Sequence, residues 1–265
     1  MRLAAMVVYP LKGARGVAVE RWRVATTGFA RDRQFMVVDA GGRFISQREQ
    51  PAMALWRVSA DGDAMRIELP GHLRPFELPW TPEGDALDVT IWSDRVRAVA
   101  PDPALDAAIS RELGQPCRLV HIPDTSIRQV DPHYSQPGDR VGFADGFPFL
   151  LCTQASLDDL NARLDAPVPM NRFRPNLVIE GATPFAEDTW SRVQVGALSF
   201  DVVKPCARCV VTTVDQATAR GGKEPLRTLA TYRRAPDGSV HFGQNLIHRD
   251  LGVLSVGDPV AVITP

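Results

Sequence analysis

Two cysteines lie three residues apart in the segment VVKPCARCVVTTVD, which spans residues 202–215. The spacing of Cys206 and Cys209 is compatible with half of a zinc site, a dithiol redox pair, or a thiolate ligand for another metal or cofactor. Arg208 lies directly before Cys209, and Lys204 is close in sequence. Because these cations favour a thiolate over a thiol, the segment is a candidate site for thiolate chemistry.

Two of these possibilities demand surroundings that the sequence does not supply. A structural zinc site usually takes its four ligands from two close pairs, whereas Cys117 and Cys152 are isolated and the five histidines show no ligand spacing. A reactive dithiol places its first cysteine at the N-terminus of a helix, whereas the VVTTV that follows Cys209 favours a strand. Zinc and dithiol chemistry stay open as minor alternatives, beside the simpler one of two buried structural thiols.

We expect the segment CVVTTVD, residues 209–215, to form a strand. Side chains alternate between the two faces of a strand, so residues three apart point in opposite directions. Cys206 and Cys209 would then not share one ligand position. At most one of them is expected to be a working thiolate, and a soft thiolate selects a soft or redox-active metal centre.

The composition is that of a soluble globular protein, with 45% hydrophobic and 23% charged residues in a chain of 265. This length suffices for one large or two modest domains. The formal net charge of −1 gives no reason to expect bulk attraction to nucleic acid or to an anionic membrane. The N-terminal apolar run is too short for a signal peptide or a membrane span, so we expect a cytoplasmic protein whose cysteines stay reduced.

The first part of the chain has the pattern of a β-rich domain. Two strands are expected around the turn in residues 34–49, and one alternating strand over residues 86–100. A helix should follow, capped by Asp102 and ended by Gly114. Residues 122–148 are polar and rich in Pro, Gly and Asp, which predicts a long loop.

The second part combines strands with helices. Its first helix should begin at Ser156, which with Asp159 would form a capping box. We place the domain boundary at the start of the long loop, which divides the chain into residues 1–122 and 123–265. The remaining expected elements are a hairpin about Gly196, a helix over residues 223–234 and a closing strand over residues 256–263.

Motifs along almost the whole chain resemble those of MOSC-domain proteins with an N-terminal MOSC β-barrel domain. In chain order the motifs are YPLKGARG, GFARDRQFMVV, FPFLLCTQASLDDLN, NRFRPNLVI, KPCARCVVTTVD, FGQN and VGDPV. This family includes the mitochondrial amidoxime reducing components and their bacterial counterparts. The resemblance implies a mainly β (α+β) fold with a few helices, in which a MOSC β-barrel domain packs against a smaller β-rich N-terminal domain.

The resemblance also implies a molybdenum cofactor, in which the dithiolene of a molybdopterin and one protein thiolate hold the metal. By position in the motif that thiolate is Cys209, and Cys206 is not a ligand. The pterin phosphate would be held by Lys12, Arg33 and Arg174, since lysine supplies a point charge and arginine a fork for two oxygens. The other cofactor contacts implied by the family are Gly13, Asp145, Asn176, Ala207, Arg208 and Asn245.

The reaction that the resemblance implies is the reduction of small N-hydroxylated compounds such as amidoximes, hydroxylamines or N-hydroxylated bases. Electrons should come from a separate protein, because no cysteine cluster of a ferredoxin type follows Cys209. Two positions depart from the family pattern. Gly13 stands where relatives often have serine, and Asn245 stands where the mitochondrial relatives have tyrosine, so substrate preference stays open.

Two other functions remain as alternatives at this point. The chain could bind and carry the molybdenum cofactor without turnover, or it could carry sulfur as a persulfide on Cys209. Asp215 follows the cysteine segment, and we expect it to cap a turn rather than to donate a proton.

Overall fold

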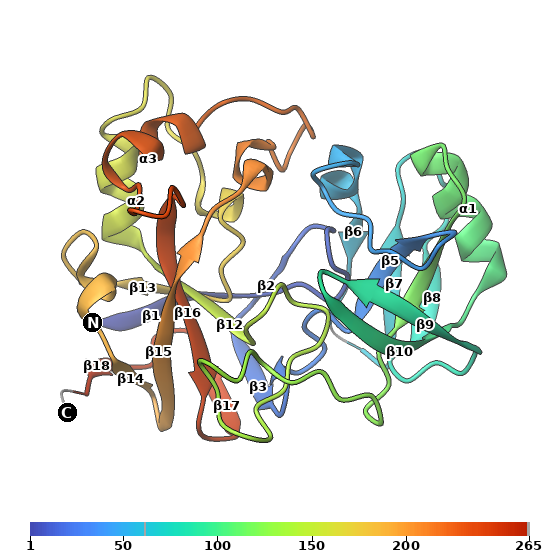
Figure 1. The fold of residues 1–265 in the computed structure, drawn as a ribbon, viewed down its shortest axis with the longest axis horizontal. Helices are drawn as coiled ribbons and strands as arrows, with labels where there is room; N and C mark the ends of the chain where they lie inside the picture. Colours follow the sequence, from blue (N-terminus) through green and yellow to red (C-terminus); the bar gives the residue numbers. More distant parts are fainter. Residues whose placement is uncertain (61, 264–265) are drawn as a thin grey trace.

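The computed structural model describes residues 1–60 and 62–263. Figure 1 shows two β-rich lobes side by side, with long loops between them. The described elements are eighteen strands, three α-helices and four short 3-10 helices. The chain is therefore mainly β with a few helices, as the sequence predicted. None of the described helices is long enough to cross a membrane, since the longest of them has eleven residues.

The larger lobe is built on one eight-stranded sheet. Its order is β18 (Val260–Val262), β14 (Arg192–Val195), β15 (Leu198–Ala207), β16 (His241–His248), β12 (Phe149–Thr153), β13 (Leu177–Glu180), β1 (Arg2–Val8) and β2 (Val17–Val19). Neighbours run antiparallel except β12 and β13, which are parallel. A bridge between Arg2 and Pro259 joins the start of β1 to the segment before β18, but the sheet is not closed.

The smaller lobe contains two further sheets and a helix. A four-stranded sheet has the order β5 (Phe35–Asp39), β11 (Cys117–His121), β10 (Asp94–Ala100) and β9 (Asp85–Ile91). A three-stranded sheet consists of β6 (Arg57–Val58), β7 (Ala64–Glu68) and β8 (Phe76–Pro79). Helix α1 (Pro103–Leu113) packs Leu105 and Ile109 into the core of this lobe, which also contains Trp56.

A third small sheet pairs the two ends of the chain. It consists of β17 (Gly252–Ser255), β3 (Arg21–Ala25) and β4 (Gly28–Phe29). Strand β3 pairs with β17, and β1 in the large sheet pairs with β13, so two strands of the first thirty residues pair with strands that lie far along the chain. The short 3-10 helices are η1 (Pro51–Leu55), η2 (Met170–Arg172), η3 (Ala186–Thr189) and η4 (Val210–Thr213).

Several predicted elements are confirmed in detail. The Asp102 side chain accepts hydrogen bonds from the backbone N–H groups of Ala104 (2.8 Å) and Leu105 (3.1 Å), and so caps α1. Gly114 ends that helix in the left-handed conformation at φ 68°. The hairpin of β14 and β15 turns at Gly196, and helix α3 (Leu226–Tyr232) follows Pro225.

The prediction that Ser156 caps a helix was wrong. Helix α2 (Gln154–Asn161) begins earlier, and its cap is Thr153, whose hydroxyl accepts from the backbone N–H of Ser156 at 3.2 Å. The Ser156 hydroxyl instead donates to the buried carboxyl of Glu187 at 2.7 Å. The hydrogen bond to Glu187 replaces the capping bond that the sequence predicted for Ser156. The spacing of Ser156 and Asp159 alone therefore misplaces the first turn of α2.

The strand predicted for CVVTTVD was also wrong. Strand β15 ends at Ala207, and the residues after Cys209 form the 3-10 helix η4. The hydroxyls of Thr212 and Thr213 donate to the carbonyl oxygens of Cys209 (2.9 Å) and Val210 (2.7 Å), which supports the turn despite its β-branched composition. The alternation argument therefore does not apply, because only one cysteine of the pair lies on the strand.

The other strand errors lie in the smaller lobe. Residues 86–100 form the hairpin of β9 and β10 rather than one strand, with Trp92 in its two-residue turn. In residues 34–49 only β5 is a full strand, and its expected partner is reduced to a bridge between Val38 and Phe44. Both regions still supply the β-rich pattern that was predicted.

The predicted long loop is confirmed, since no helix or strand occurs among residues 122–148. Buried Arg128 fixes its end by donating to the Asp94 carboxylate (2.7 Å) and to the carbonyl oxygens of Gly142 (2.9 Å) and Ala144 (2.5 Å). These bonds place residue Asp145, which follows directly, between the two lobes. The division at residue 122 remains a prediction.

We predict that acid weakens the fold through His121, a buried residue whose ring lies 4.8 Å from that of Phe35. Burial lowers its pKa from 6.5 to about 4, so between these values the unfolded chain binds a proton that the folded chain does not. The free energy of unfolding should therefore fall as pH drops from 7 to 4, by about 3 kcal/mol from this residue. Urea unfolding should show a smaller loss for His121→Gln than for the wild type; equal losses would contradict the assignment.

Candidate functional site

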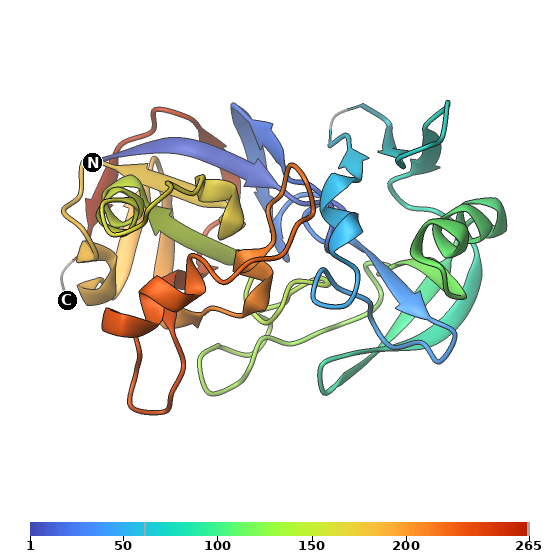
Figure 2. The ribbon, with the colours of Figure 1, turned by 90° about the horizontal axis from the view of Figure 1, so that it is seen from above.

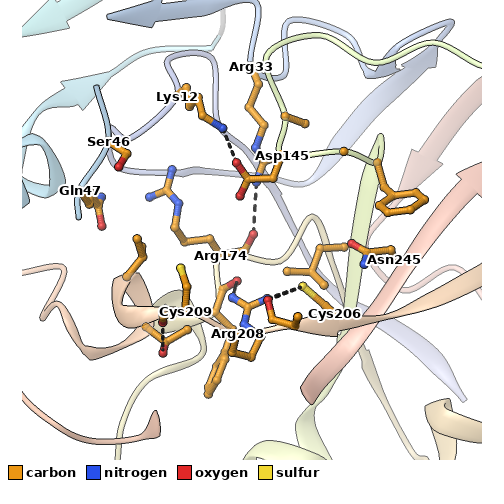
Figure 3. Close-up of a pocket in the computed structure, with 18 of the residues that line it drawn as sticks. Lys12, Arg33, Ser46, Gln47, Asp145, Arg174, Cys206, Arg208, Cys209 and Asn245 are labelled. Carbon is orange, nitrogen blue, oxygen red and sulfur yellow. Dashed lines mark hydrogen bonds and ion pairs between the residues drawn. The ribbon is translucent and has the colours of Figure 1, made fainter. Parts of the chain in front are cut away.

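A cleft between the two lobes, drawn in part in Figure 3, brings together all ten residues that the family resemblance implied for the cofactor site. It holds a cavity of about 150 Å³ and is lined by segments that are far apart in the chain. In Figure 2 the orange segment that follows β15 lies beside the light-blue η1 segment of the smaller lobe. The predicted residues on its wall are Lys12, Gly13, Arg33, Asp145, Arg174, Asn176, Ala207, Arg208, Cys209 and Asn245.

Three cations gather at one end of the cleft, and a buried tyrosine organises two of them. The guanidinium carbons of Arg33 and Arg174 lie 4.5 Å and 4.4 Å from the ring centre of Tyr9. Both arginines have left-handed backbone, at φ 49° and 56°, which is uncommon outside glycine. Lys12 completes the group and is only 8% exposed. This cation cluster, defined as Lys12, Arg33 and Arg174, is thus preorganised by the fold.

Polar partners behind the cation cluster hold Arg33 in place. It pairs with the buried carboxylate of Asp32 and donates to the side-chain oxygen of Asn176 at 3.2 Å. Asn176 also accepts from the backbone N–H of Leu150 (3.3 Å) and donates to the carbonyl oxygen of Val7 (3.1 Å). Asn176 therefore braces the arginine and ties three strands together.

The cation cluster carries more positive charge than the carboxylates beside it balance. Burial lowers the pKa of Arg174 to about 10, with the nearby Arg33 acting in the same direction. Burial likewise lowers the pKa of Lys12. No salt bridge to Arg174 occurs among the residues that the structure describes. An anion with more than one charge would relieve this repulsion, so the end of the cleft is suited to a phosphate group.

Asp145 lies across the mouth of the cation cluster. Its carboxylate accepts from the ammonium of Lys12 at 2.5 Å, although 74% of the Asp145 side-chain surface is exposed and only 10% of that of Lys12. Figure 3 shows this pair above Arg174. The Trp92 indole N–H also donates to this carboxylate, at 3.3 Å, so an anion that binds the buried ammonium would have to displace a carboxylate held by two donors.

Two sulfur atoms lie at the opposite end of the cleft from Lys12 (Figure 3). Arg208 donates to the Cys206 sulfur at 2.8 Å and to the carbonyl oxygen of Phe173 at 2.6 Å, while its buried Nε has no partner among the described residues. The Cys209 sulfur has no hydrogen-bond partner in the described ranges. Cys206 is thus engaged, whereas Cys209 offers a free lone pair to a ligand.

The remaining predicted residues complete the walls. Gly13 has a left-handed backbone at φ 89°, and its carbonyl oxygen accepts from Gln47 at 2.5 Å. Ala207 ends β15 beside the cysteines, and Asn245 lies on the adjacent β16. Asp215 accepts from the backbone N–H groups of residues 217 and 218, so it caps a turn as predicted.

Sequence reasoning missed several residues of the site. Tyr9 belongs to the YPLKG motif, and its position three residues before Lys12 was the available signal. Gln47, Phe44 and Trp92 come from the smaller lobe and give no local signal. Arg172 was missed as well: it donates to the carbonyl oxygen of Thr212 at 2.8 Å and so fixes the turn that carries Cys209.

The match to known proteins covers both lobes. Residues 1–116 match the model of the MOSC N-terminal beta barrel domain, and residues 138–261 match that of the MOSC domain. The chain is 32% identical to human mitochondrial amidoxime-reducing component 1 over 98% of this chain and 82% of that protein. The chain belongs to the MOSC-domain family. The zebrafish protein of the same name is also 32% identical, over 98% of this chain and 84% of its own length.

A second group of relatives of this MOSC protein consists of molybdenum cofactor sulfurases. The rice protein is 28% identical over 95% of this chain but only 33% of its own length. The MOSC domain and both groups of relatives are associated with the molybdenum cofactor. The described residues fit such a group, because a cation cluster for a phosphate lies at one end of the cleft and a thiol with a free sulfur at the other.

We predict that Arg174→Met stabilises the cofactor-free protein and weakens its response to phosphate. Removing a buried cation that Arg33 repels should raise the free energy of unfolding by about 1–2 kcal/mol. Thermal unfolding with and without inorganic phosphate measures both effects. Arg66→Met, which alters an exposed pair with Glu77, is the matched control and should change neither. A lower melting temperature for Arg174→Met without phosphate would contradict the charge surplus.

Proposed function

We propose that this MOSC protein reduces small N-hydroxylated compounds with a molybdenum cofactor. The observation that carries the proposal is the single cleft in which the free sulfur of Cys209 shares a cavity with a buried cation cluster. The cofactor has a metal at one end and a phosphate at the other, and the cleft offers a suitable partner for each. Similarity to amidoxime-reducing components over 98% of the chain supports the choice of substrate class.

Each residue then has a separate task. Cys209 as thiolate would hold the metal, and Lys12, Arg33 and Arg174 would hold the phosphate. Arg208 would keep the Cys206 sulfur occupied, so that only one thiol competes for the metal. When bound, the molybdenum would supply the two-electron chemistry that side chains lack.

The overall reaction balances with two electrons and two protons. The N–O bond of a hydroxylamine or amidoxime breaks, the nitrogen gains hydrogen, and the oxygen leaves as water. The electrons would come from a separate donor protein that docks near the cleft. We also propose a cytoplasmic location, where thiols such as Cys209 stay reduced.

A second candidate is favoured by the sulfurase relatives. Their similarity spans 95% of this chain, so the same cleft could serve a protein that carries the cofactor, or one that carries sulfur on Cys209. A carrier would bind molybdenum without reducing amidoximes. A sulfur carrier would contain a persulfide and no stoichiometric molybdenum.

We predict that Cys209→Ala loses molybdenum and amidoxime reduction, whereas Cys206→Ala keeps the metal. The reason is that the Cys209 sulfur is free, while that of Cys206 accepts a hydrogen bond from Arg208 at 2.8 Å. Protein made in a host that supplies the cofactor is measured for molybdenum per chain and for benzamidoxime reduction with a reduced dye. Reduction at wild-type rate by Cys209→Ala would falsify the ligand assignment. Wild-type protein with metal but no reduction would favour the carrier.

A further inference from the structure

Two buried glutamines join the lobes beside the cation cluster. Gln47 lies between β5 and η1 in the smaller lobe, and Gln216 follows η4 in the larger one. Their exposed fractions are 1% and 4%. The Nε2 of Gln216 donates to the side-chain oxygen of Gln47 at 2.9 Å, and the Nε2 of Gln47 donates back at 3.2 Å. Because both amides are buried, each has to find its partners inside the protein.

This pair of amides ends on Arg174. The Nη1 of the arginine donates to the side-chain oxygen of Gln216 at 3.4 Å, and this is the one hydrogen bond of the Arg174 side chain within the described residues. In Figure 3 the Arg174 guanidinium lies on the Gln47 side of the cleft. The bond is long and uses one N–H group among several, so the other donors stay available for a ligand.

Gln47 determines which end of the Gln216 amide meets Arg174. A glutamine can present its oxygen or its NH2 group, and only the oxygen can accept from an arginine. The NH2 group of Gln216 is taken by the Gln47 oxygen and by the carbonyl oxygen of Val214 at 3.1 Å. Gln47 is fixed in turn, because its Nε2 donates to the carbonyl oxygen of Gly13 at 2.5 Å. The oxygen of Gln216 is therefore left to face Arg174.

The neutral charge of the amide matters for the cation cluster. Arg33 and Lys12 each pair with a carboxylate, whereas Arg174 has no carboxylate partner in the part of the chain that the structure describes. A carboxylate at the position of Gln216 would neutralise Arg174 and compete with an incoming anion. An amide oxygen orients the guanidinium and leaves its charge uncompensated, so the positive site stays ready for an anion.

We propose that Gln216 and Gln47 are positioning residues that hold Arg174 for the phosphate of the bound group. This inference rests on the proposed function and adds two residues that lie outside every motif of the sequence. Gln216 acts directly on the guanidinium, and Gln47 acts through Gln216. Neither takes part in bond breaking.

Sulfate binding by the full chain without cofactor tests this role in the absence of turnover. Sulfate has the tetrahedral shape of a phosphate group, and its charge does not change near neutral pH. Gln216→Met removes the acceptor at similar size, and isothermal titration at low ionic strength should show sulfate affinity about 5-fold below that of the wild type. Gln47→Met should lose about 2-fold to 3-fold, and the double variant no more than Gln216→Met alone.

A general loss of packing makes a different prediction, and an Arg174→Met background separates the two. If Gln216 acts through Arg174, Gln216→Met changes sulfate affinity in that background by less than about 1.5-fold. Gln50→Met is the matched control, since the Gln50 amide donates to the carbonyl oxygen of Leu113 at 3.2 Å and does not line the cleft. Its affinity should equal that of the wild type. Equal losses from Gln216→Met in both backgrounds, or wild-type affinity in Gln216→Met, overturn the positioning role.

Gln216→Glu tests the neutral amide without that background. Its carboxylate would pair with Arg174, so sulfate affinity should fall further than in Gln216→Met, by about 10-fold or more relative to the wild type. Affinity equal to that of Gln216→Met, or higher, contradicts the need for a neutral acceptor and overturns the inference.

Cofactor-loaded protein separates this inference from the proposed function. Absence of amidoxime reduction in the loaded wild type overturns the proposed function and leaves the sulfate results as they are. Amidoxime reduction by the wild type, together with undiminished sulfate affinity in Gln216→Met, overturns the positioning role alone.

Discussion

Arg33 and Arg174 carry like charges, yet both guanidinium groups lie against the same buried ring, that of Tyr9. Such a pair is unfavourable without an anion, and the fold compensates with the Asp32 carboxylate and the Asn176 amide. The rest of the cleft depends on this arrangement, since Tyr9 extends β1 and Asn176 precedes β13, two neighbouring strands of the large sheet. Sheet pairing therefore sets the spacing of the cations.

The end of the cleft that holds the two sulfur atoms is built in a different way. Strand β15 ends at Ala207, and Cys209 lies outside it, directly before the 3-10 helix η4. The hydroxyl of Thr212 and the guanidinium of Arg172 satisfy the backbone oxygens of that turn, so it is stable without a strand partner. Lys12, Arg33 and Arg174 lie in short segments next to strands β1, β5 and β13, and a supported turn holds the sulfur. A ligand that spans the cleft thus contacts one fixed wall and one wall that is locally braced.

Much of the architecture could be predicted from local signals. Asp102 and Gly114 bound α1, and the long loop appeared where Pro, Gly and Asp concentrate. Two of the failures arise because a hydrogen bond of a side chain overrides the expected local preference, in one case with a distant partner and in the other with a neighbouring carbonyl. Glu187 draws Ser156 away from its capping role, and threonine hydroxyls stabilise a turn in a sequence that favours strands.

In the candidate site, too, some residues could be predicted from the sequence and others could not. Lys12, Arg33 and Arg174 could be named because each lies in a motif that resembles a known family. Tyr9 and Trp92 could not, since their roles arise from packing between segments that are far apart in sequence. A motif identifies the groups that meet a ligand, whereas the groups that hold them in place are visible only in three dimensions.

The place of β1 in the large sheet has a further consequence for how such a protein can evolve. Tyr9 and Lys12 directly follow this strand, whose partner β13 belongs to the opposite half of the chain. A fragment that began in the long loop would leave β13 as a bare sheet edge and would lack Lys12 and Arg33, two of the three cations of the cluster. The two halves are therefore not interchangeable modules, and recombination between relatives would have to keep the segments of β1 and β13 together.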